Sequence, residues 1–361
     1  MMRFGTRFRV TLFGTSHGPE VGVVVEGVPK GRPVDVAAIQ LALDRRRPVG
    51  RPLASRRRED DQLVVDQGIR RGLATGGPIR LHVANTDVRR SDYDRLRTTP
   101  RPGHADYPAR IRYGEDADLS GGGIFSGRMT VGLVAAGAIA SAWLHELGVE
   151  LAGYVVSIGD ASAFPEPTTS LGDLRRVRDR NEVGCPDPDV AARMATDIAA
   201  ARRAGDSLGG LVEVRATGLP VGIGEPFFDS VESTIAHIAF AVPAVKGVEF
   251  GAGFGVARMC GSENNDPYFY DGGTVRTRTN HAGGILGGLS TGMDLVARFA
   301  VKPTASIARE QETVDLASKT PARIVVTGRH DPCIVPRAAP VLEAVVAIAL
   351  VDLALRAGVL K

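Results

Sequence analysis

The stretch that decides the fold, Thr99 to Glu146, joins a polar loop to an apolar helix. It begins TPRPGHAD, passes through GGGIFSGR at 121–128 and continues as MTVGLVAAGAIASAWLHE. From about Met129 to Leu147 there is almost no polar face, and a helix that is apolar on all sides is normally buried. We therefore expect a core helix here, with a polar loop at its start.

The loop before this helix carries groups suited to binding an anion. Its three consecutive glycines let a backbone approach a ligand without a Cβ clash and leave amide hydrogens available to a negative charge. Ser126 adds a hydroxyl and Arg128 a permanent cation, while Arg101-Pro-Gly presents His104 on a stiff turn of the kind that often carries catalytic side chains. From spacing alone, a surface loop that leads into a core helix is an equally good interpretation.

Seven arginines lie within the fourteen residues from Arg45 to Arg58. A solvated basic face, a nucleic-acid patch and a site for a small, multiply anionic ligand would each explain them. No aromatic residue is interleaved for base stacking, and Glu59-Asp60-Asp61 follow at once and would repel a polyanionic backbone. Because guanidinium groups bind carboxylate and phosphate in bidentate geometry, we favour the small anion.

The composition is that of a soluble globular protein, since 43% of the 361 residues are hydrophobic and 24% are charged. The formal charge of +3 is too small by itself to indicate nucleic acid or a membrane surface as a partner. Cys185, Cys260 and Cys333 are far apart and match no metal-ligand spacing, so we expect no disulfide, no metal site and a reducing cytoplasm. The most membrane-like run, 338–357, is interrupted by charges and is better interpreted as a second core helix.

Short alternating or β-branched runs predict strands on both sides of the apolar helices. The expected strands are 7–13, 21–28, 63–69, 78–85, 151–158, 209–217, 293–301 and 323–327, and the expected further helices are 35–47, 189–204 and 227–242. We expect 161–189 to be a connector and 261–292 to be a large irregular region. Two long apolar helices with many short strands joined by hairpins indicate an α+β fold, the helices packed between sheets.

Three histidines allow a structural interpretation. His17 follows a strand end in a turn, where both a water-facing and a functional histidine fit the pattern. The neighbouring Ser16 hydroxyl can orient its imidazole or bind phosphate. His82 in a strand and His237 in a helix are expected to be structural.

Six blocks in one order give the chain a specific resemblance. They are FGTSHG at 13–18, LDRRRP at 43–48, RPGHAD at 101–106 with GGG and SGR after it, NHAGGILGG at 280–288, KPT at 302–304 and GRHDPC at 328–333. Together they resemble the chorismate synthase family over nearly the whole chain, from Phe8 to about Leu355. Single blocks of this kind are common by chance, whereas six in one order are highly specific.

The resemblance implies an α+β fold with long core helices sandwiched between antiparallel sheets, in a single domain over residues 1–361. It implies a carbon–oxygen lyase of the shikimate pathway that removes phosphate from 5-enolpyruvylshikimate 3-phosphate by anti-1,4-elimination and yields chorismate. Reduced FMN would be the cofactor, and some members reduce it with NADPH. A small-molecule substrate, a homotetramer and a cytoplasmic location are also implied, with neither nucleic acid nor a membrane as partner.

The resemblance further implies which residues act. His17 is expected near the phosphate with Ser16 beside it, His104 near the flavin, and Asp331 as a relay toward flavin N5. The residues expected to line FMN are Phe125, Ser126, Ala244, Gly287, Lys302, Pro303, Thr304, Ala305, Ser306 and Arg329. The expected charge clamp around the substrate is Arg46, Arg47, Arg128 and Arg329, and Arg46 also matches a position linked with NADPH.

The sequence departs from the family pattern at three places. Thr15 replaces an acidic residue, Val49-Gly50 replaces a glycine directly after the arginines, and Ile124-Phe125-Ser126-Gly127 stands where many members have Arg-Ser-Ser-Ala. Loss of a cation from this loop predicts altered flavin affinity rather than a different reaction. The alternatives are a related flavoenzyme with another enolpyruvyl or phosphorylated substrate, and an anion- or nucleic-acid-binding protein built on Arg45 to Arg58.

Overall fold

The structure is a computed structural model that describes residues 2–47, 53, 59–87, 96–114, 118, 120–326 and 330–360. Several positions singled out in the sequence lie outside the described residues. They are Arg329, Val49-Gly50 and the arginines at 51 and 56–58. Their predicted roles therefore stay predictions.

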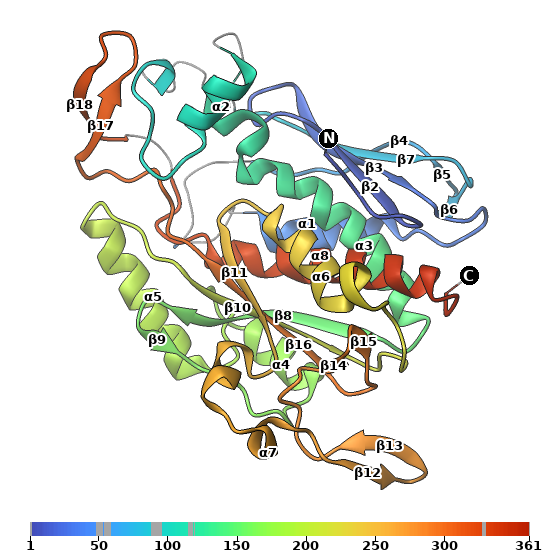
Figure 1. The fold of residues 1–361 in the computed structure, drawn as a ribbon. Coiled ribbons are helices and arrows are strands. Elements are labelled where there is room, and N and C mark those ends of the chain that lie inside the picture. The colour runs from blue at the N-terminus through green and yellow to red at the C-terminus, as the bar shows by residue number, and fades with distance from the viewer. Residues whose placement is uncertain are drawn as a thin grey trace.

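Two five-stranded sheets enclose a layer of long helices (Figure 1). The first sheet has the order β1 (Arg3–Phe4), β2 (Arg9–Gly14), β3 (Glu20–Glu26), β7 (Ile79–Ala84) and β4 (Val64–Gln67). The second has the order β11 (Val245–Phe250), β16 (Leu295–Val301), β10 (Gly210–Thr217), β8 (Glu150–Ile158) and β9 (Ala161–Ser162). Neighbouring strands are antiparallel throughout both sheets.

The helices between the sheets are α1 (Val36–Arg46), α3 (Thr130–His145), α6 (Val231–Phe240) and α8 (Val335–Arg356). Helix α3 packs on β2, β3 and β7 of the first sheet, α8 packs on β8 and β10 of the second, and the two helices pack on each other. The predicted α+β sandwich is therefore confirmed. The segment Gly127–His145, which contains α3, and helix α8 are both long and apolar enough to cross a membrane. Most of each is buried inside the protein, so they are core helices as predicted.

Helix α1 shows how local sequence positions one wall of the later site. The Asp35 side chain accepts hydrogen bonds from the backbone of Ala37 and Ala38 and so caps the first turn. Arg45 and Arg46 occupy the last turn, where the helix dipole favours cations. The helix thus ends with two guanidinium groups directed away from its axis toward neighbouring elements.

Shorter elements surround this sandwich. The remaining helical segments are α2 (Asp106–Tyr113), η2 (Ser120–Phe125), η3 (Gly127–Met129), α4 (Leu171–Arg178), α5 (Pro188–Arg203), η4 (Phe227–Asp229), η5 (Gly253–Arg258) and α7 (Gly261–Asn264). The remaining strands form four hairpins: β5 (Ile69–Arg70) with β6 (Leu73–Ala74), β12 (Tyr268–Asp271) with β13 (Thr274–Thr277), β14 (Ile285–Leu286) with β15 (Leu289–Ser290), and β17 (Gln311–Asp315) with β18 (Thr320–Ile324).

Three sequence expectations need correction. The supposed connector 161–189 contains α4, an amphipathic helix capped by Ser170 whose Leu171 and Leu174 pack on the outer face of β8. The supposed irregular region 261–292 contains α7 and two hairpins, whose strands are too short to show a clear alternation. Of the two interpretations left open for His17, the water-facing one is wrong, because its exposed fraction is only 5%.

Two other histidines fulfil the structural expectation. His82 Nδ1 lies 2.9 Å from Oδ2 of Asp66, and His237 packs edge-on against Phe4. The single domain over 1–361 stays a prediction, although one hydrophobic cluster contains side chains from both sheets and from the helices between them.

The crossing of α3 and α8 predicts a stability effect at Gly137. A Cβ atom there would lie 2.3 Å from the Cβ of Ala344 and 2.6 Å from its Cα, so the helices would have to move apart. We expect Gly137→Ala to lower the free energy of unfolding by about 1–3 kcal/mol, as overpacked cores do. Urea denaturation should show a lower midpoint.

Gly255→Ala is the matched control, because no atom lies within 4 Å of a Cβ built there. It should stay within about 0.5 kcal/mol of the unsubstituted protein, as surface changes usually do. Equal midpoints for the two variants would contradict the close helix crossing.

Candidate active site

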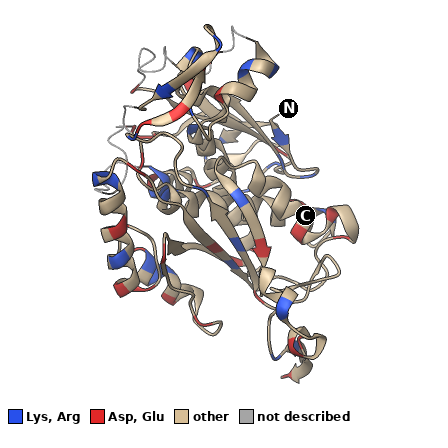
Figure 2. Cartoon of the chain, turned by 60° about the vertical axis from the view of Figure 1, so that its left-hand side comes forward, with Lys and Arg blue, Asp and Glu red and all other residues tan. Residues whose placement is uncertain are grey.

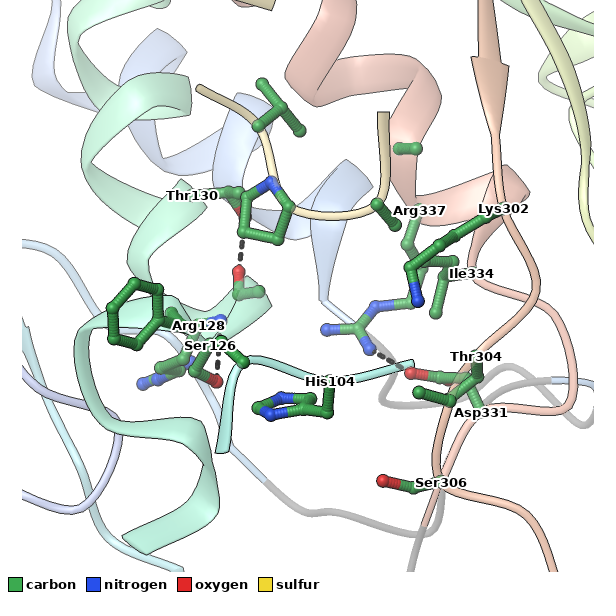
Figure 3. A pocket seen from close by; sticks show the side chains of 18 of the residues that line it. His104, Ser126, Arg128, Thr130, Lys302, Thr304, Ser306, Asp331, Ile334 and Arg337 are labelled. Carbon is green, nitrogen blue, oxygen red and sulfur yellow. Dashed lines mark hydrogen bonds and ion pairs between the residues drawn. The ribbon is translucent and has the colours of Figure 1, made fainter. Parts of the chain in front are cut away.

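One cavity of about 610 Å³ lies where α1 ends and where α3 and α8 begin, among the described residues. Its other walls are the loop around His104, the segment 240–246 before and within β11, and the segment 302–306 after β16. Figure 3 shows His104 and Ser126 on one side, with Lys302, Arg337 and Asp331 facing them across the space. The volume is in the range of pockets that bind cofactors and small molecules.

Most of the residues predicted from sequence meet in this cavity although they come from distant parts of the chain. Those that line it are His17, Arg46, His104, Phe125, Ser126, Arg128, Ala244, Lys302, Pro303, Thr304, Ala305, Ser306 and Asp331. Ser16 lies behind His17 and is fully buried. Arg47 and Gly287 do not line the cavity, and Arg329 lies outside the described residues.

His104 is held by a buried ion pair beside the cavity. Its Nδ1 lies 2.7 Å from Oδ1 of Asp106, and Arg101 donates to both oxygens of the same carboxylate at 2.8 Å. The Arg101 side chain also donates to the Ser306 hydroxyl at 3.0 Å. The imidazole is thereby connected to the segment 302–306 that was expected to line the flavin.

His17 is oriented by Ser16. The Ser16 hydroxyl lies 3.1 Å from His17 Nδ1 and donates to the carbonyl oxygens of Ser120 and Gly121 at 3.0 and 3.2 Å. Since a hydroxyl has one hydrogen and that hydrogen points at the carbonyls, its oxygen accepts from His17 Nδ1–H. The His17 ring held in this way lines the cavity.

The triple glycine explains how both imidazoles fit. A Cβ at Gly121 would lie 2.0 Å from Cε1 of His17, and a Cβ at Gly122 would lie 3.2 Å from Cε1 of His104. Both glycines have a positive backbone φ, +61° and +91°, which residues other than glycine rarely adopt. The bare backbone of 121–122 therefore packs against both histidine rings.

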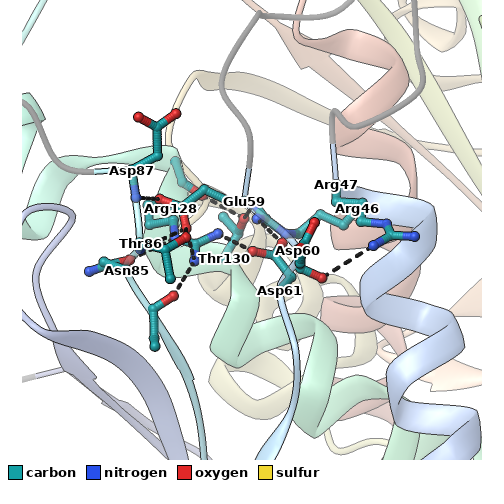
Figure 4. Close-up of polar contacts among 12 residues, drawn as sticks. Arg46, Arg47, Glu59, Asp60, Asp61, Asn85, Thr86, Asp87, Arg128 and Thr130 are labelled. Atoms are coloured by element: carbon teal, nitrogen blue, oxygen red, sulfur yellow. Dashed lines mark hydrogen bonds and ion pairs between the residues drawn. The ribbon is translucent and has the colours of Figure 1, made fainter.

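Two of the arginines expected to clamp the substrate, Arg46 and Arg128, are paired with buried carboxylates (Figure 4). Arg46 donates to Asp61 at 2.8 Å and to the Thr130 hydroxyl at 3.2 Å. Arg128 forms an ion pair with Asp61 and donates to the carboxylate of Glu59 at 3.4 Å. The sequence had suggested only that these acidic residues repel a polyanion, and missed that they neutralise the arginines.

The pKa values of this cluster follow from burial and pairing. Burial lowers the pKa of Arg46 to about 10, with Asp61 opposing the shift, so the guanidinium stays charged at neutral pH. Burial alone would raise the pKa of the Asp61 carboxyl, but Arg46 and Arg128 hold it below its usual value. Arg46 and Asp61 therefore form a buried pair of opposite charges.

Arg128 and Arg47 are less available than predicted. The remaining donors of Arg128 bond to Asn85 Oδ1 at 2.9 Å and to the Ala84 carbonyl at 3.2 Å, so this side chain mainly ties the η3 turn to β7. Arg47 contacts Asp44 at 3.3 Å outside the cavity. The clamp role of Arg47 is not supported by its position.

Arg337 is a site residue that sequence reasoning missed. Its Nη1 donates to Oδ2 of Asp331 at 2.6 Å, and its Nε donates to the Arg46 carbonyl oxygen at 3.1 Å. It connects the expected relay carboxylate with the end of α1. The available signal was a cation in the first turn of a helix that is otherwise almost entirely apolar.

The cavity has an excess of positive charge among the described residues that line it. The cations are Arg46, Arg101, Arg128, Lys246, Lys302 and Arg337, and the carboxylates are Glu59, Asp87 and Asp331. Burial and the nearby Lys246 both lower the pKa of Lys302, whose ammonium donates to the Gly103 carbonyl at 2.7 Å. Two ammonium groups that destabilise each other favour an anion between them.

Two buried polar atoms of the cavity walls have no hydrogen-bond partner within the described chain, Arg46 Nε and Thr304 Oγ1. Buried polar atoms are normally satisfied, so such exceptions indicate a missing ligand or water. Together with the cation excess and the glycine backbone, they fit a flat, anionic cofactor such as a flavin mononucleotide. Within the described residues there is no cluster of side chains suited to a metal ion.

Comparisons with known proteins agree with this site. A family model described as chorismate synthase matches residues 8–355. The chain is 47% identical to the chorismate synthase of Dehalococcoides mccartyi over 99% of this chain and 97% of that protein. It is 50% identical to that of Aeropyrum pernix over 97% of this chain and 92% of that protein.

A solved structure gives the same answer at the level of the fold. The structure titled "Crystal Structure of Chorismate Synthase" aligns with a TM-score of 0.77 and 28% identity, covering 98% of this chain and 93% of that one. Sequence and fold thus agree over nearly the full length of the chain. The chain belongs to the chorismate synthase family, whose members are lyases of the shikimate pathway.

Proposed function

We propose that this protein is a reduced-FMN-dependent lyase that converts 5-enolpyruvylshikimate 3-phosphate to chorismate by anti-1,4-elimination. A ring carbon–oxygen bond to phosphate breaks, and a hydrogen is lost from the 1,4-related ring carbon. The observation that carries the proposal is the convergence of His17, His104, Asp331 and an excess of cations on a single cavity. A substrate with two carboxylates and a phosphate needs such a positive site.

The residues fit a flavin, which would be held by Phe125, Ser126, Ala244 and the segment from Lys302 to Ser306. When bound, the reduced flavin supplies electron density that assists loss of phosphate and recovers it afterwards, without net redox change. Ala244 has the backbone angle φ +77° and accepts a hydrogen bond from the Lys302 amide at 2.9 Å. This contact brings the two walls of the proposed cofactor site together.

His17 is proposed to protonate the departing phosphate. Ser16 holds the ring through Nδ1, and the protonated imidazole at the cavity wall can give up a proton to the phosphate. Arg46 and Arg337 are proposed to stabilise the departing phosphate electrostatically, the buried Asp61 keeping Arg46 fixed and ionised.

Asp331 is proposed as the carboxylate that receives the proton lost from the substrate. Arg337 fixes one of its oxygens at 2.6 Å, so the carboxylate is held at the cavity wall. Arg329, predicted to act beside it, remains part of this proposal. Gly287 is left out, because it lies in the β14–β15 hairpin and does not line the cavity.

The proposals on assembly, location and type of ligand draw on surface side chains, cysteines and charge distribution. Phe227 and Phe228 are 85% and 94% exposed, and adjacent exposed aromatic side chains support the expected homotetramer. The three free cysteines fit a reducing cytoplasm. Basic and acidic residues are interspersed along the described chain (Figure 2), which supports a small molecule rather than nucleic acid as the ligand.

The proposal is tested by mixing the protein anaerobically with chemically reduced FMN and 5-enolpyruvylshikimate 3-phosphate and measuring phosphate release. We expect release with a transient change in the flavin spectrum and no net oxidation. Flavin binding without phosphate release would favour a different phosphorylated or enolpyruvyl substrate. Repeating the reaction with oxidised FMN and NADPH tests whether the protein reduces its own flavin.

His104→Ala should lower phosphate release to a small residual rate, because the ring that contacts the proposed flavin site is removed. A loss of at least about 100-fold in kcat is expected for a general acid or base. His82→Ala is the matched control, since His82 bonds Asp66 on the first sheet and does not line the cavity. Near-normal turnover by the His104 variant would refute the assignment.

Gly121→Ala should displace His17. Since the new Cβ would overlap the imidazole, we expect kcat to fall on the order of 100-fold, the range for a lost proton donor. Gly114→Ala is the control for backbone strain, because Gly114 also has positive φ, +85°, but no atom within 4 Å of a Cβ. Similar kinetics for the two variants would show that His17 placement does not matter.

Arg337→Gln should release Asp331 from its ion pair. We expect kcat to fall by about 100-fold, as when one charge-stabilising donor is removed from an active site. Arg356→Gln on the same helix is the control, since Arg356 pairs at 2.9 Å with the exposed Asp229. Unchanged kcat in the Arg337 variant would remove Arg337 and its carboxylate from the proposed mechanism.

A further inference from the structure

Asp106 forms a buried junction behind His104. Its Oδ2 accepts from the Arg101 backbone at 3.0 Å and from Arg101 Nε at 2.8 Å. Its Oδ1 accepts from Arg101 Nη2 at 2.8 Å and lies 2.7 Å from Nδ1 of His104. With 7% of the residue exposed, this carboxylate is almost shielded from water.

The carboxylate is ionised in this setting. Burial by itself would raise the pKa of Asp106, but the hydrogen bonds from Arg101 and His104 hold it well below its usual range. Its position in the first turn of α2 also favours a negative charge, because the helix dipole is positive there. A permanently ionised Asp106 can only accept hydrogen bonds.

This fixes the tautomer of His104. Arg101 Nη2 lies 3.1 Å from Nδ1 and 3.4 Å from Nε2, so it is near both ring nitrogens and does not select a tautomer. The Asp106 carboxylate is closer, at 2.7 Å from Nδ1, and two acceptors would repel each other there, so His104 Nδ1 carries a hydrogen and donates it to Asp106. Nε2 is then the atom that can accept or release a proton elsewhere. Nε2 lies beside Gly122, because a Cβ built on that glycine would be 3.3 Å from it.

Arg101 extends the junction to a second wall of the cavity. Its Nη1 donates to the Ser306 hydroxyl oxygen at 3.0 Å. Because that contact uses a lone pair of the oxygen, the hydroxyl hydrogen of Ser306 remains to be donated to a ligand. Asp106 thus orients the His104 ring directly and the Ser306 hydroxyl through Arg101.

We propose that Asp106 is a positioning residue that holds His104 with Nδ1 protonated, so that Nε2 exchanges the proton with the ligand in the cavity. The proposal deepens the lyase assignment and rests on it for the identity of the ligand. The tautomer itself is a property of the protein alone.

Asp106→Asn is the decisive variant. Both Oδ2 contacts come from donors of Arg101 that cannot become acceptors, whereas one of the two Oδ1 contacts is to the His104 ring, whose tautomer can change. The single oxygen of asparagine would therefore replace Oδ2, and its amide would face His104. The amide donates, so His104 Nδ1 would become an acceptor and Nε2 would carry the hydrogen. The expected result is a reversed tautomer and a fall in kcat of about 100-fold or more.

The tautomer is read by NMR of protein labelled with ¹⁵N-histidine, with His104→Gln used to assign the signal. We expect Nδ1–H in the unsubstituted protein and Nε2–H in Asp106→Asn. Asp173→Asn is the control, because Asp173 lies on exposed α4 and bonds Ser170 and Arg176. An unchanged tautomer in Asp106→Asn would overturn the proposal. If that variant fails to fold, the unsubstituted protein decides, and Nε2–H in it would overturn the proposal.

A double variant separates positioning from general damage. If Asp106 acts only through His104, Asp106→Asn should cost no further activity in a His104→Ala background. An additional tenfold loss there would overturn the proposal. Absence of phosphate release by the unsubstituted protein would instead refute the lyase assignment and leave the NMR result to stand by itself.

Discussion

The structure of the site depends on one buried carboxylate, Asp61, which lies between two guanidinium groups. Its side chain is 0% exposed in its ion pairs with Arg46, at the end of α1, and Arg128, before α3. Removing one partner of such a buried pair typically costs about 3–5 kcal/mol, because a charge is left uncompensated. Asp61 therefore fixes two helix ends relative to each other, and its backbone adopts the unusual φ of +48° in doing so.

Further contacts extend this cluster to the first sheet. Asn85, directly after β7, accepts from Arg128 and donates to the carbonyls of Thr15 and Gly18, on either side of the His17 turn. Glu59 accepts from the backbone and hydroxyl of Thr86. The position of His17 is thus linked, through Asn85 and Arg128, to the same carboxylate that holds Arg46.

The apolar core gives this polar cluster a rigid support. Helices α3 and α8 are buried along most of their length, and both begin at the cavity. Their close contact at Gly137 leaves little freedom for either start to move. The buried helices therefore give the polar loops a rigid base, and contacts with Ser16, Asp106 and Arg337 then hold His17, His104 and Asp331 in place.

The sequence predicted those features that depend on local pattern. The apolar runs predicted both core helices, and alternation predicted most strands of the two sheets. The glycine run predicted a close backbone approach, and the structure adds that the approach is to the two histidine rings. The resemblance to the family predicted that residues from distant parts of the chain share one site, which hydrophobic periodicity cannot predict.

Other features depend on the tertiary fold and were beyond local reasoning. Arg46 and Arg128 are far apart in sequence from each other, so their shared partner Asp61 could not be recognised. Arg337 was hidden in an apolar helix, and α4 was hidden because a short, charged helix has only two buried leucines to mark it. Gly287 matched a family position, yet its hairpin does not reach the cavity within this chain.

The most direct measurement is a crystal structure of the protein with oxidised FMN and 5-enolpyruvylshikimate 3-phosphate. The account predicts that both molecules occupy the cavity between α1, α3 and α8, with the substrate phosphate toward His17 and Arg46 and the flavin along the segment from Lys302 to Ser306. Binding of either molecule at another place on the chain would contradict it.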